Sequence, residues 1–332
     1  MKRCNITAVV VTHNRKEILE ECLEALEAQK AKPMTVANLL GEDLGVSKIK
    51  QYGPGGFSFD VLVVDNASTD GTEEYIQDIL DRHPNKLSYI RLEENLGGAG
   101  GFAFGMKYAV EHGASYVWVM DDDTIPEKDA LEKLVQAMTA LKEANVRFGF
   151  LSSKAVWTDG TPSKMNQQEK VEPRNEKQRR LMESHRIMPV KSATFVSLLI
   201  PAGMISSLGL PLKEYFIWGD DKEFTLRLSD VRNCFTVEDS VVVHKTKNNV
   251  GSSIIDDDLE RIHRYYYAYR NDLSTARKRG GKEVLIYQLA YCLNWLRVVF
   301  RGKEGKGKRL AVMRQGRKDG KKFLPEVEYP EI

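Results

Sequence analysis

The first half of the 332-residue chain alternates two hydrophobic patterns. Short runs rich in Val, Ile, Leu and Tyr are each followed by a stretch in which apolar residues recur every three or four positions. The pattern predicts strands at 6–11, 61–64, 87–92 and 116–120, and helices at 16–29, 72–81 and 101–111. Strands that alternate with helices in this way are typical of an α/β fold, a mostly parallel sheet with helices on both faces.

Three segments depart from this alternation. The connection 33–59 is longer than the usual two to six residues, and glycines near its end predict an inserted loop or short helix. The polar segment 164–186 predicts an exposed loop or helix, and β-rich composition returns at 192–200. From residue 257 onward the pattern is helical and includes the apolar stretch 284–300. We therefore expect an α/β domain over 1–250 and a helical region over 251–332.

Composition and charge exclude several classes of protein. The four cysteines, Cys4, Cys22, Cys234 and Cys292, lack any C-x-x-C spacing, so neither a disulfide framework nor a zinc site is expected. No apolar run reaches the roughly 18 residues that span a bilayer, and no signal peptide precedes the first predicted strand, so we expect a cytoplasmic protein. Residues 261–322 hold 18 Lys and Arg but 4 Asp and Glu. No nucleic-acid-binding module accompanies this charge, and no nucleic-acid partner is expected.

Three adjacent acids, Asp121, Asp122 and Asp123, directly follow the fourth predicted strand. Ligands gather at the carboxyl ends of such strands. Neighbouring carboxylates repel one another unless a cation or donor groups compensate, and alternate residues of an extended segment point the same way. Asp121 and Asp123 are therefore expected to share one Mg²⁺ or Mn²⁺ ion. The alternative is a helix N-cap, because residues 124–126 open a helical pattern.

A second acid pair, Asp220 and Asp221, follows an aromatic segment and opens another predicted helix. The helix dipole favours acids there by roughly 0.3–1 kcal/mol regardless of function, so capping is an alternative to catalysis. Trp218 fits either the wall of a sugar site, since a sugar's C–H face packs on an aromatic ring, or the core. His244 follows an apolar run and fits either a structural role or a metal ligand.

Four motifs occur in the order typical of one enzyme family: residues 9–15 (VVVTHNR), 63–72 (VVDNASTDGT), 95–102 (NLGGAGGF) and 118–123 (WVMDDD). The chain resembles family 2 glycosyltransferases, which have the A-type nucleotide-sugar-binding, Rossmann-like fold. The glycine-rich run before the three acids, the segment 216–223 and His244 are most similar to bacterial galactofuranosyltransferases. The motif 266–271 (YYAYRN) is similar to one in rhamnosyltransferase-like relatives. The resemblance covers roughly residues 6–272.

The resemblance implies a nucleotide-binding half at 1–125, an acceptor half at 126–250 and a basic C-terminal extension. The nucleotide-sugar pocket would be lined by Thr12, Asn14, Arg15, Asp65, Asn66, Asn95, Gly98, Asp121 and Asp122. Mn²⁺ or Mg²⁺ would be held by Asp121, Asp123 and His244, and Trp218 would contact the acceptor. Asp221 matches the family's general base, although relatives often have Glu-Asp where this chain has Asp220-Asp221, so the base could be either residue.

The reaction expected from this resemblance is inverting transfer of galactofuranose from a UDP-sugar to a cell-surface glycan or lipid-linked acceptor. A dTDP-rhamnose donor is the alternative. Gly98, Gly100 and Ala103 also fit a dinucleotide-binding fingerprint, but that fingerprint belongs in the first strand-helix turn. A pyrophosphorylase would need a basic glycine-rich loop after the first strand, and a noncatalytic scaffold would not need acids at strand ends. The stretch 284–300 and the basic residues after it predict either docking at the inner face of the membrane or packing within the chain or a homo-oligomer.

Overall fold

The computed structural model describes residues 4–29, 57–82, 87–166, 168–173, 175–302 and 304–331. The long connection predicted at 33–59 lies outside the described residues except for its last three positions. Those three positions begin the second strand of the sheet, so the insertion itself has no structural outcome here.

The described strands form one sheet with the order β3-β2-β1-β4-β8-β6-β9-β5, and β7 pairs with β9 as well. The strands are β1 (Cys4–Thr12), β2 (Phe57–Asp65), β3 (Ser88–Arg91), β4 (Tyr116–Asp121), β5 (Thr124–Pro126), β6 (Phe148–Val156), β7 (Ile187–Val190), β8 (Leu198–Pro201) and β9 (Asn233–His244). The first four are parallel, as the alternation predicts. β8 is antiparallel to β4 and β6, while β5 and β7 are antiparallel to β9, so the sheet as a whole is mixed.

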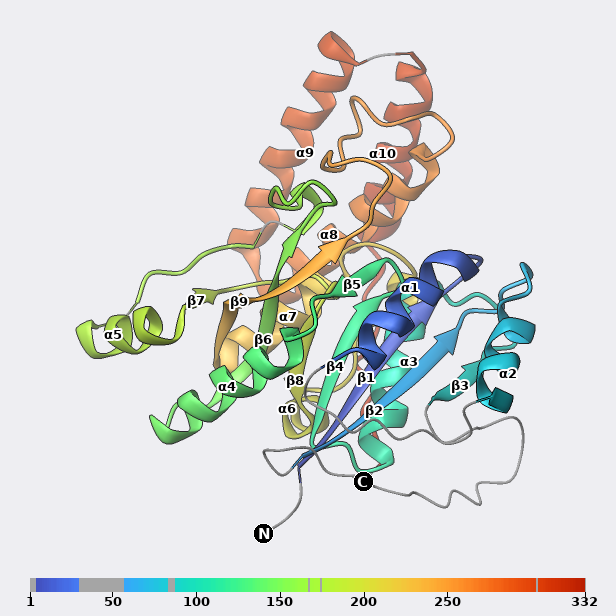
Figure 1. Cartoon of the computed structure of the whole chain (residues 1–332). Coiled ribbons are helices and arrows are strands. Elements are labelled where there is room, and N and C mark those ends of the chain that lie inside the picture. The colour runs from blue at the N-terminus through green and yellow to red at the C-terminus, as the bar shows by residue number, and fades with distance from the viewer. Residues whose placement is uncertain are drawn as a thin grey trace.

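Helices cover both faces of the sheet, as expected (Figure 1). One face packs on α1 (Lys16–Glu27), α2 (Thr72–Arg82) and α4 (Ala130–Glu143), and the other packs on α3 (Gly97–Glu111), α6 (Ala202–Leu208) and α7 (Asp220–Val231). The period-two alternation of a strand divides its side chains between the faces. In β1, Val10 joins the first hydrophobic cluster while Val9 and Val11 join the second.

The C-terminal helices stand at the end of the sheet toward which β4 and β9 run (Figure 1). They are α8 (Tyr265–Arg279), α9 (Gly281–Arg301) and α10 (Lys306–Gly320), preceded by the short 3-10 helix η3 (Ile262–Arg264). They share a hydrophobic cluster that includes Tyr269, Leu273 and Met313. The tail returns to the α/β part, where Glu328 pairs with Lys107 at 2.7 Å. No helix in the described ranges is long and apolar enough to cross a membrane.

Several predicted boundaries were wrong. Residues 124–126 form strand β5 rather than a helix start, because Thr124 pairs with His244 at the end of β9 and this long-range pairing outweighs local capping. The expectation of an exposed loop or helix over 164–186 was correct, because that segment contains the 3-10 helix η1 (Lys164–Asn166) and α5 (Glu176–His185). Strand structure in 192–200 begins at Leu198, and the C-terminal helical region begins at η3 rather than at residue 257.

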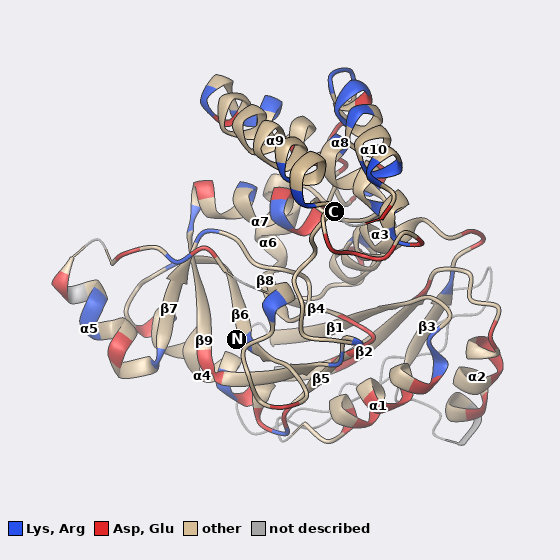
Figure 2. Ribbon diagram, turned by 90° about the horizontal axis from the view of Figure 1, so that it is seen from above, with Lys and Arg blue, Asp and Glu red and all other residues tan. Residues whose placement is uncertain are grey.

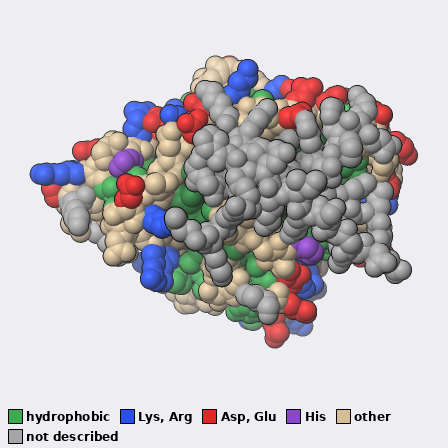
Figure 3. All heavy atoms as spheres, turned by 60° about the horizontal axis from the view of Figure 1, so that its bottom comes forward, with side chains coloured by type: hydrophobic (Ala, Val, Ile, Leu, Met, Phe, Trp, Pro, Cys, Tyr) green, Lys and Arg blue, Asp and Glu red, His purple; other side chains and the backbone are tan. Residues whose placement is uncertain are grey.

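The surface differs between the two ends of the molecule. On the face seen in Figure 3, the described charged side chains of both signs are interspersed with small hydrophobic patches. On α9 and α10, Lys and Arg predominate (Figure 2). Large apolar side chains on α9, such as Leu285 and Phe300, are exposed by 61% and 77%.

Candidate active site

An open cleft of about 1130 Å³ lies where the carboxyl ends of β1, β4 and β9 meet the C-terminal helices. Its lining includes both acid clusters identified in the sequence. The predicted site residues that line it are Thr12, Arg15, Asn66, Asn95, Gly98, Asp121, Asp122, Asp123, Trp218, Asp220, Asp221 and His244. The fold therefore brings together residues more than two hundred positions apart in the chain.

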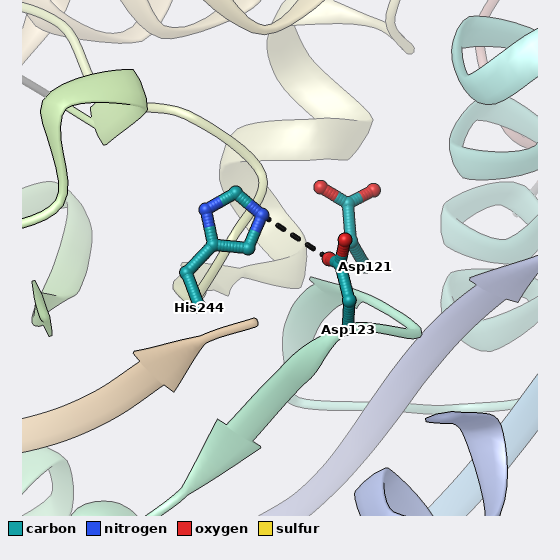
Figure 4. A group of neighbouring side chains, drawn as sticks. All are labelled: Asp121, Asp123 and His244. Atoms are coloured by element: carbon teal, nitrogen blue, oxygen red, sulfur yellow. Dashed lines mark ion pairs between the residues drawn. The ribbon is translucent and has the colours of Figure 1, made fainter. Parts of the chain in front are cut away.

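The middle acid of the triple Asp is held by the first strand and the loop after it. The hydroxyl of Thr12 donates a hydrogen bond of 2.7 Å to Asp122, which is buried. The Arg15 guanidinium pairs with Asp122 at 2.9 Å and with Asp123 at 2.7 Å. Both carboxylate oxygens of Asp122 are thus used within the protein, and Asp121 and Asp123 are left facing His244 (Figure 4).

The side chains of Asp121, Asp123 and His244 form a candidate metal site. One ligand atom from each lies within 4.8 Å of the others. The Nε2 atom of His244 lies 3.1 Å from Oδ1 of Asp123 (Figure 4). That Oδ1 is buried and receives no well-aligned hydrogen bond from the described residues. A buried carboxylate oxygen without a donor fits a cation, and two carboxylates with one imidazole suit Mn²⁺ or Mg²⁺.

Asn166 sets the orientation of the His244 ring. Its Oδ1 lies 2.7 Å from Nδ1 of His244, and its amide nitrogen donates to Thr194 at 2.7 Å. Because a carbonyl oxygen can only accept, Nδ1 of His244 is the donor. In a neutral ring this leaves the Nε2 lone pair facing Asp123, which is the arrangement that a metal-binding histidine requires.

Burial shifts the pKa values of these acids in different directions. Burial and the charge of Asp123 raise the pKa of Asp121 to about 8. Burial raises the pKa of Asp122 to about 6 against the opposing charge of Arg15. Burial also acts to raise the pKa of Asp123, but His244 and Arg15 outweigh it, and this pKa lies below its usual value. A divalent cation would offset this surplus of buried carboxylates.

Two asparagines shape the glycine-rich turn at the start of α3. The Asn66 amide donates to the carbonyl of Gly97 at 3.0 Å, and the Gly97 N–H donates to Asn95 at 2.8 Å. A Cβ on Gly98 would meet nothing within 4 Å. The backbone at Gly98 is therefore open to a ligand in the cleft, as a nucleotide-binding role requires.

Asp65 and Asn14 do not line the cleft. Asp65 is completely buried and accepts hydrogen bonds from the Ser68 N–H at 2.8 Å and the Tyr89 hydroxyl at 2.7 Å. Asn14 accepts a 2.7 Å hydrogen bond from the Thr69 N–H. In this conformation Asn14 ties the loop after β1 to the loop after β2, and Asp65 ties the loop after β2 to β3. Contact between Asp65 and a uracil would require one of its bonds to open.

The second acid pair begins α7 after a left-handed Gly219, whose φ is 90°. Burial and the charge of Asp221 raise the pKa of Asp220 to about 8. Burial raises the pKa of Asp221 to about 6, with the Lys222 backbone N–H opposing the shift. Near pH 7, Asp221 is therefore the more fully deprotonated of the two, as a general base requires. Trp218 packs edge-on against Tyr265 with ring centroids 5.0 Å apart.

The chain is similar to proteins of one known family. The sequence model of glycosyl transferase family 2 matches residues 7–199, more than half of the chain. The chain belongs to glycosyl transferase family 2. This family 2 chain is 27% identical over 236 residues to galactofuranosyltransferase GlfT1 of Mycolicibacterium smegmatis. The aligned region covers 67% of this chain and 65% of that protein. It thus spans slightly less than two thirds of that relative's length.

Solved structures share the fold. The structure of S. aureus TarS 1-349 in complex with UDP has a TM-score of 0.51 and 16% identity, covering 96% of this chain and 91% of that one. A mannosyltransferase of Pyrobaculum calidifontis, in complex with GDP-Man and Mn²⁺, has a TM-score of 0.50 and 18% identity. The match covers 97% of this chain and 85% of the mannosyltransferase. The A-type fold and the similarity to galactofuranosyltransferases are thereby confirmed.

The sequence motifs did not predict that the C-terminal region of this family 2 chain forms one wall of the cleft. Arg264, Asn294 and Arg297 all line the cleft. Burial and the nearby charges of Arg261 and Arg15 lower the pKa of Arg264. The side chain of Arg264 makes no hydrogen bond or ion pair with the described residues. The excess of Lys and Arg in 261–322 was the signal that could have located it, but charge density does not show which cation faces the cleft.

Proposed function

We propose that this chain is a metal-dependent, inverting glycosyltransferase that moves galactofuranose from UDP-galactofuranose to a hydroxyl group of a cell-surface glycan or lipid-linked acceptor. The observation that carries the proposal is that a candidate metal triad and a second acid pair line one cleft. A cation on the triad can bind the diphosphate of a nucleotide sugar, and the acid pair can accept the proton of an acceptor hydroxyl. The 27% identity to GlfT1 favours galactofuranose as the sugar.

The transfer step uses Asp221 as the general base. Its carboxylate takes the proton of the acceptor hydroxyl while that oxygen forms a bond to the anomeric carbon. The bond from the anomeric carbon to the phosphate oxygen breaks, and UDP leaves with the electron pair. Attack opposite to the leaving group inverts the anomeric centre. An α-linked donor therefore gives a β-linked product.

The leaving group needs compensation of the charge that develops on it. A divalent cation bound by Asp121, Asp123 and His244 would supply that compensation as a Lewis acid. Arg264 adds a positive charge on the same cleft, and no described residue neutralises it by a direct contact. Thr12 and Arg15 keep Asp122 turned away from the triad. Asn66 and Asn95 hold the glycine-rich turn open for the nucleotide.

A panel of nucleotide sugars tests the proposal. The purified chain is incubated with UDP- and dTDP-sugars in Mn²⁺, with and without excess chelator, and donor hydrolysis is measured. Consumption of UDP-galactofuranose that stops in chelator supports the proposal. Preference for dTDP-rhamnose would change the proposed donor but not the proposed reaction class. The absence of metal-dependent turnover with every donor would contradict a transferase function.

The apolar face of α9 supports a further part of the proposal, peripheral docking at the inner face of the membrane. Seven large apolar side chains of α9 are exposed: Leu285, Ile286, Leu289, Leu293, Trp295, Leu296 and Phe300. Exposed cations follow at Arg301, Lys306 and Lys308. Apolar side chains beside cations suit an anionic bilayer surface, where a lipid-linked acceptor would lie. A homo-oligomer through the same face is the competing arrangement.

A further inference from the structure

The motif at residues 266–271 lies outside the part of the chain that matches the family model, yet it contacts the loop that precedes the second acid pair. We name residues 215–219 the base loop, because Asp220 and Asp221 follow it directly. We propose that Arg270 and Asn271 are positioning residues that hold the base loop and thereby aim Asp221 into the cleft. This inference rests on the proposed function for the role of Asp221.

The base loop has a backbone conformation that its own residues do not favour. Phe216 has φ 64° and ψ −62°, and the Ile217 N–H donates to the Tyr215 carbonyl at 2.7 Å. This is a γ-turn of the strained kind. Trp218 also has a positive φ, 65°, which a bulky side chain rarely adopts. Such a conformation persists only where surrounding contacts hold it.

Asn271 supplies the contacts that the loop requires. Its side chain is completely buried, and its amide nitrogen donates to the carbonyl oxygens of Tyr215 at 2.9 Å, Ile217 at 3.2 Å and Trp218 at 2.7 Å. Two amide hydrogens thus serve three carbonyl oxygens, so one hydrogen is shared. The Asn271 oxygen in turn accepts a 2.9 Å hydrogen bond from Arg270. The three carbonyls belong to the strained segment itself.

Arg270 and an aromatic neighbour hold the same loop from the same helix. The Arg270 guanidinium donates to the carbonyls of Glu214 at 2.7 Å and Tyr215 at 3.1 Å. The Tyr267 ring stacks on Phe216 with centroids 5.1 Å apart. Residues three and four apart lie on one face of a helix, so Tyr267, Arg270 and Asn271 all face the loop. This spacing accounts for the order of residues in the motif.

The positions of Arg270 and Asn271 distinguish a positioning role from a role in binding substrate. Neither Arg270 nor Asn271 lines the cleft, whereas Asp220, Asp221 and Trp218 do. Removing the amide of Asn271 would leave three carbonyl oxygens of the loop without that donor and free the loop to relax. The expected loss is in the placement of Asp221, since the base loop carries no member of the metal triad, of which Asp121 ends β4 and His244 ends β9.

The test compares Asn271→Ala and Asn271→Asp with Leu273→Ala, a buried apolar position on the same helix that offers the base loop no side-chain hydrogen bond. We expect hydrogen exchange of peptides covering 215–221 to accelerate in both Asn271 variants and to stay unchanged in Leu273→Ala at matched loss of melting temperature. We expect kcat to fall by about tenfold to a hundredfold, with Mn²⁺-dependent UDP affinity unchanged, because a small misplacement of a reacting group has that effect.

Unchanged exchange at 215–221, or a loss of UDP affinity in parallel with kcat, would overturn the inference. Arg270→Lys provides the same comparison where the Asn271 variants do not fold, because it keeps the charge and loses the forked hydrogen bonds. A wild-type protein without transferase activity would contradict the proposed function. The exchange measurement would still decide whether Arg270 and Asn271 hold the loop.

Discussion

Gly97, at the start of α3, packs directly against the carbonyl group of Phe216, and a Cβ on Gly97 would overlap that carbonyl oxygen. The Ala99 N–H donates to the same oxygen at 3.1 Å. The glycine-rich turn on the donor side of the cleft and the base loop are therefore in contact without space for a methyl group.

Gly97→Ala is expected to destabilise the protein by about 1–3 kcal/mol, because the added methyl meets backbone and because φ at Gly97 is 71°. The matched control is Gly98→Ala, where the methyl meets nothing within 4 Å. Its free energy of unfolding should change by less than about 1 kcal/mol. Chemical denaturation of both variants measures the difference. Equal destabilisation would show that the contact with Phe216 is not the cause.

The metal triad predicts that UDP binding depends on Mn²⁺ or Mg²⁺. Asp123→Ala should abolish this dependence, whereas Asn166→Ala should weaken metal affinity by about 10- to 100-fold, because Asn166 only orients His244. Calorimetric titration of metal and UDP measures both effects. Asp159→Ala, an exposed acid that does not line the cleft, is the control and should bind as the wild type does. Full affinity for UDP in excess chelator would remove the metal from the proposed function.

Asp221→Asn should keep the fold and the affinity for UDP while reducing kcat by at least about a hundredfold, since an amide cannot accept the acceptor's proton. Asp220→Asn should have a smaller effect. Single-turnover kinetics with saturating donor measures the chemical step of both variants without a contribution from donor binding. The larger loss in Asp220→Asn would move the base by one residue.

The pH profile of kcat distinguishes the same two acids independently. A base acts in its deprotonated form, so the rate should fall as pH drops through the pKa of the residue that acts. With Asp221, whose pKa burial raises to about 6, the rate should level off above roughly pH 7. If Asp220 were the base, whose pKa is raised to about 8, the rate would still be increasing with pH at pH 7.

Arg264→Ala should raise KM for the nucleotide sugar by about tenfold or more, because a charge-assisted hydrogen bond to a phosphate contributes about 1.5–3 kcal/mol. The stability of the variant should stay near that of the wild type, since the Arg264 side chain makes no ion pair or hydrogen bond within the described structure. Arg279→Ala, which breaks an ion pair with Asp230 away from the cleft, is the control for loss of a positive charge. Equal KM values for both variants would place Arg264 outside the donor site.

Docking of α9 at a membrane predicts that the protein sediments with anionic vesicles at low salt and dissociates as salt rises, because exposed cations contribute about 1 kcal/mol each. Leu289→Gln combined with Leu293→Gln should abolish this binding. Val231→Gln, another exposed apolar side chain but on α7, is the control. Equal recovery in the supernatant under every condition, together with a dimer in solution that the paired variant disrupts, would identify the face as an oligomer contact.

Much of the α/β part could be predicted because its signals are local. Strands β1 to β4 and helices α1 to α3 appear in the predicted order, with ends shifted by a few residues. The position of the acids could be predicted as well, because Asp121 lies at the end of a strand whose apolar run is visible in the sequence. Long-range pairing could not: β8 inserts antiparallel between β4 and β6, and Thr124 pairs with His244. Cleft residues such as Arg264 were missed because the packing of η3 and α8 on the α/β part leaves no periodic pattern in the sequence.

Helix α9 contacts three different surroundings, because Tyr287, Tyr291 and Val298 are buried against the neighbouring helices. Asn294 and Arg297 line the cleft, while Leu285, Leu289 and Leu296 point into solvent. An α-helix with its side chains is about 10–12 Å across. With the apolar side resting on a bilayer, the thickness of this one helix would set the height of the cleft above the lipid.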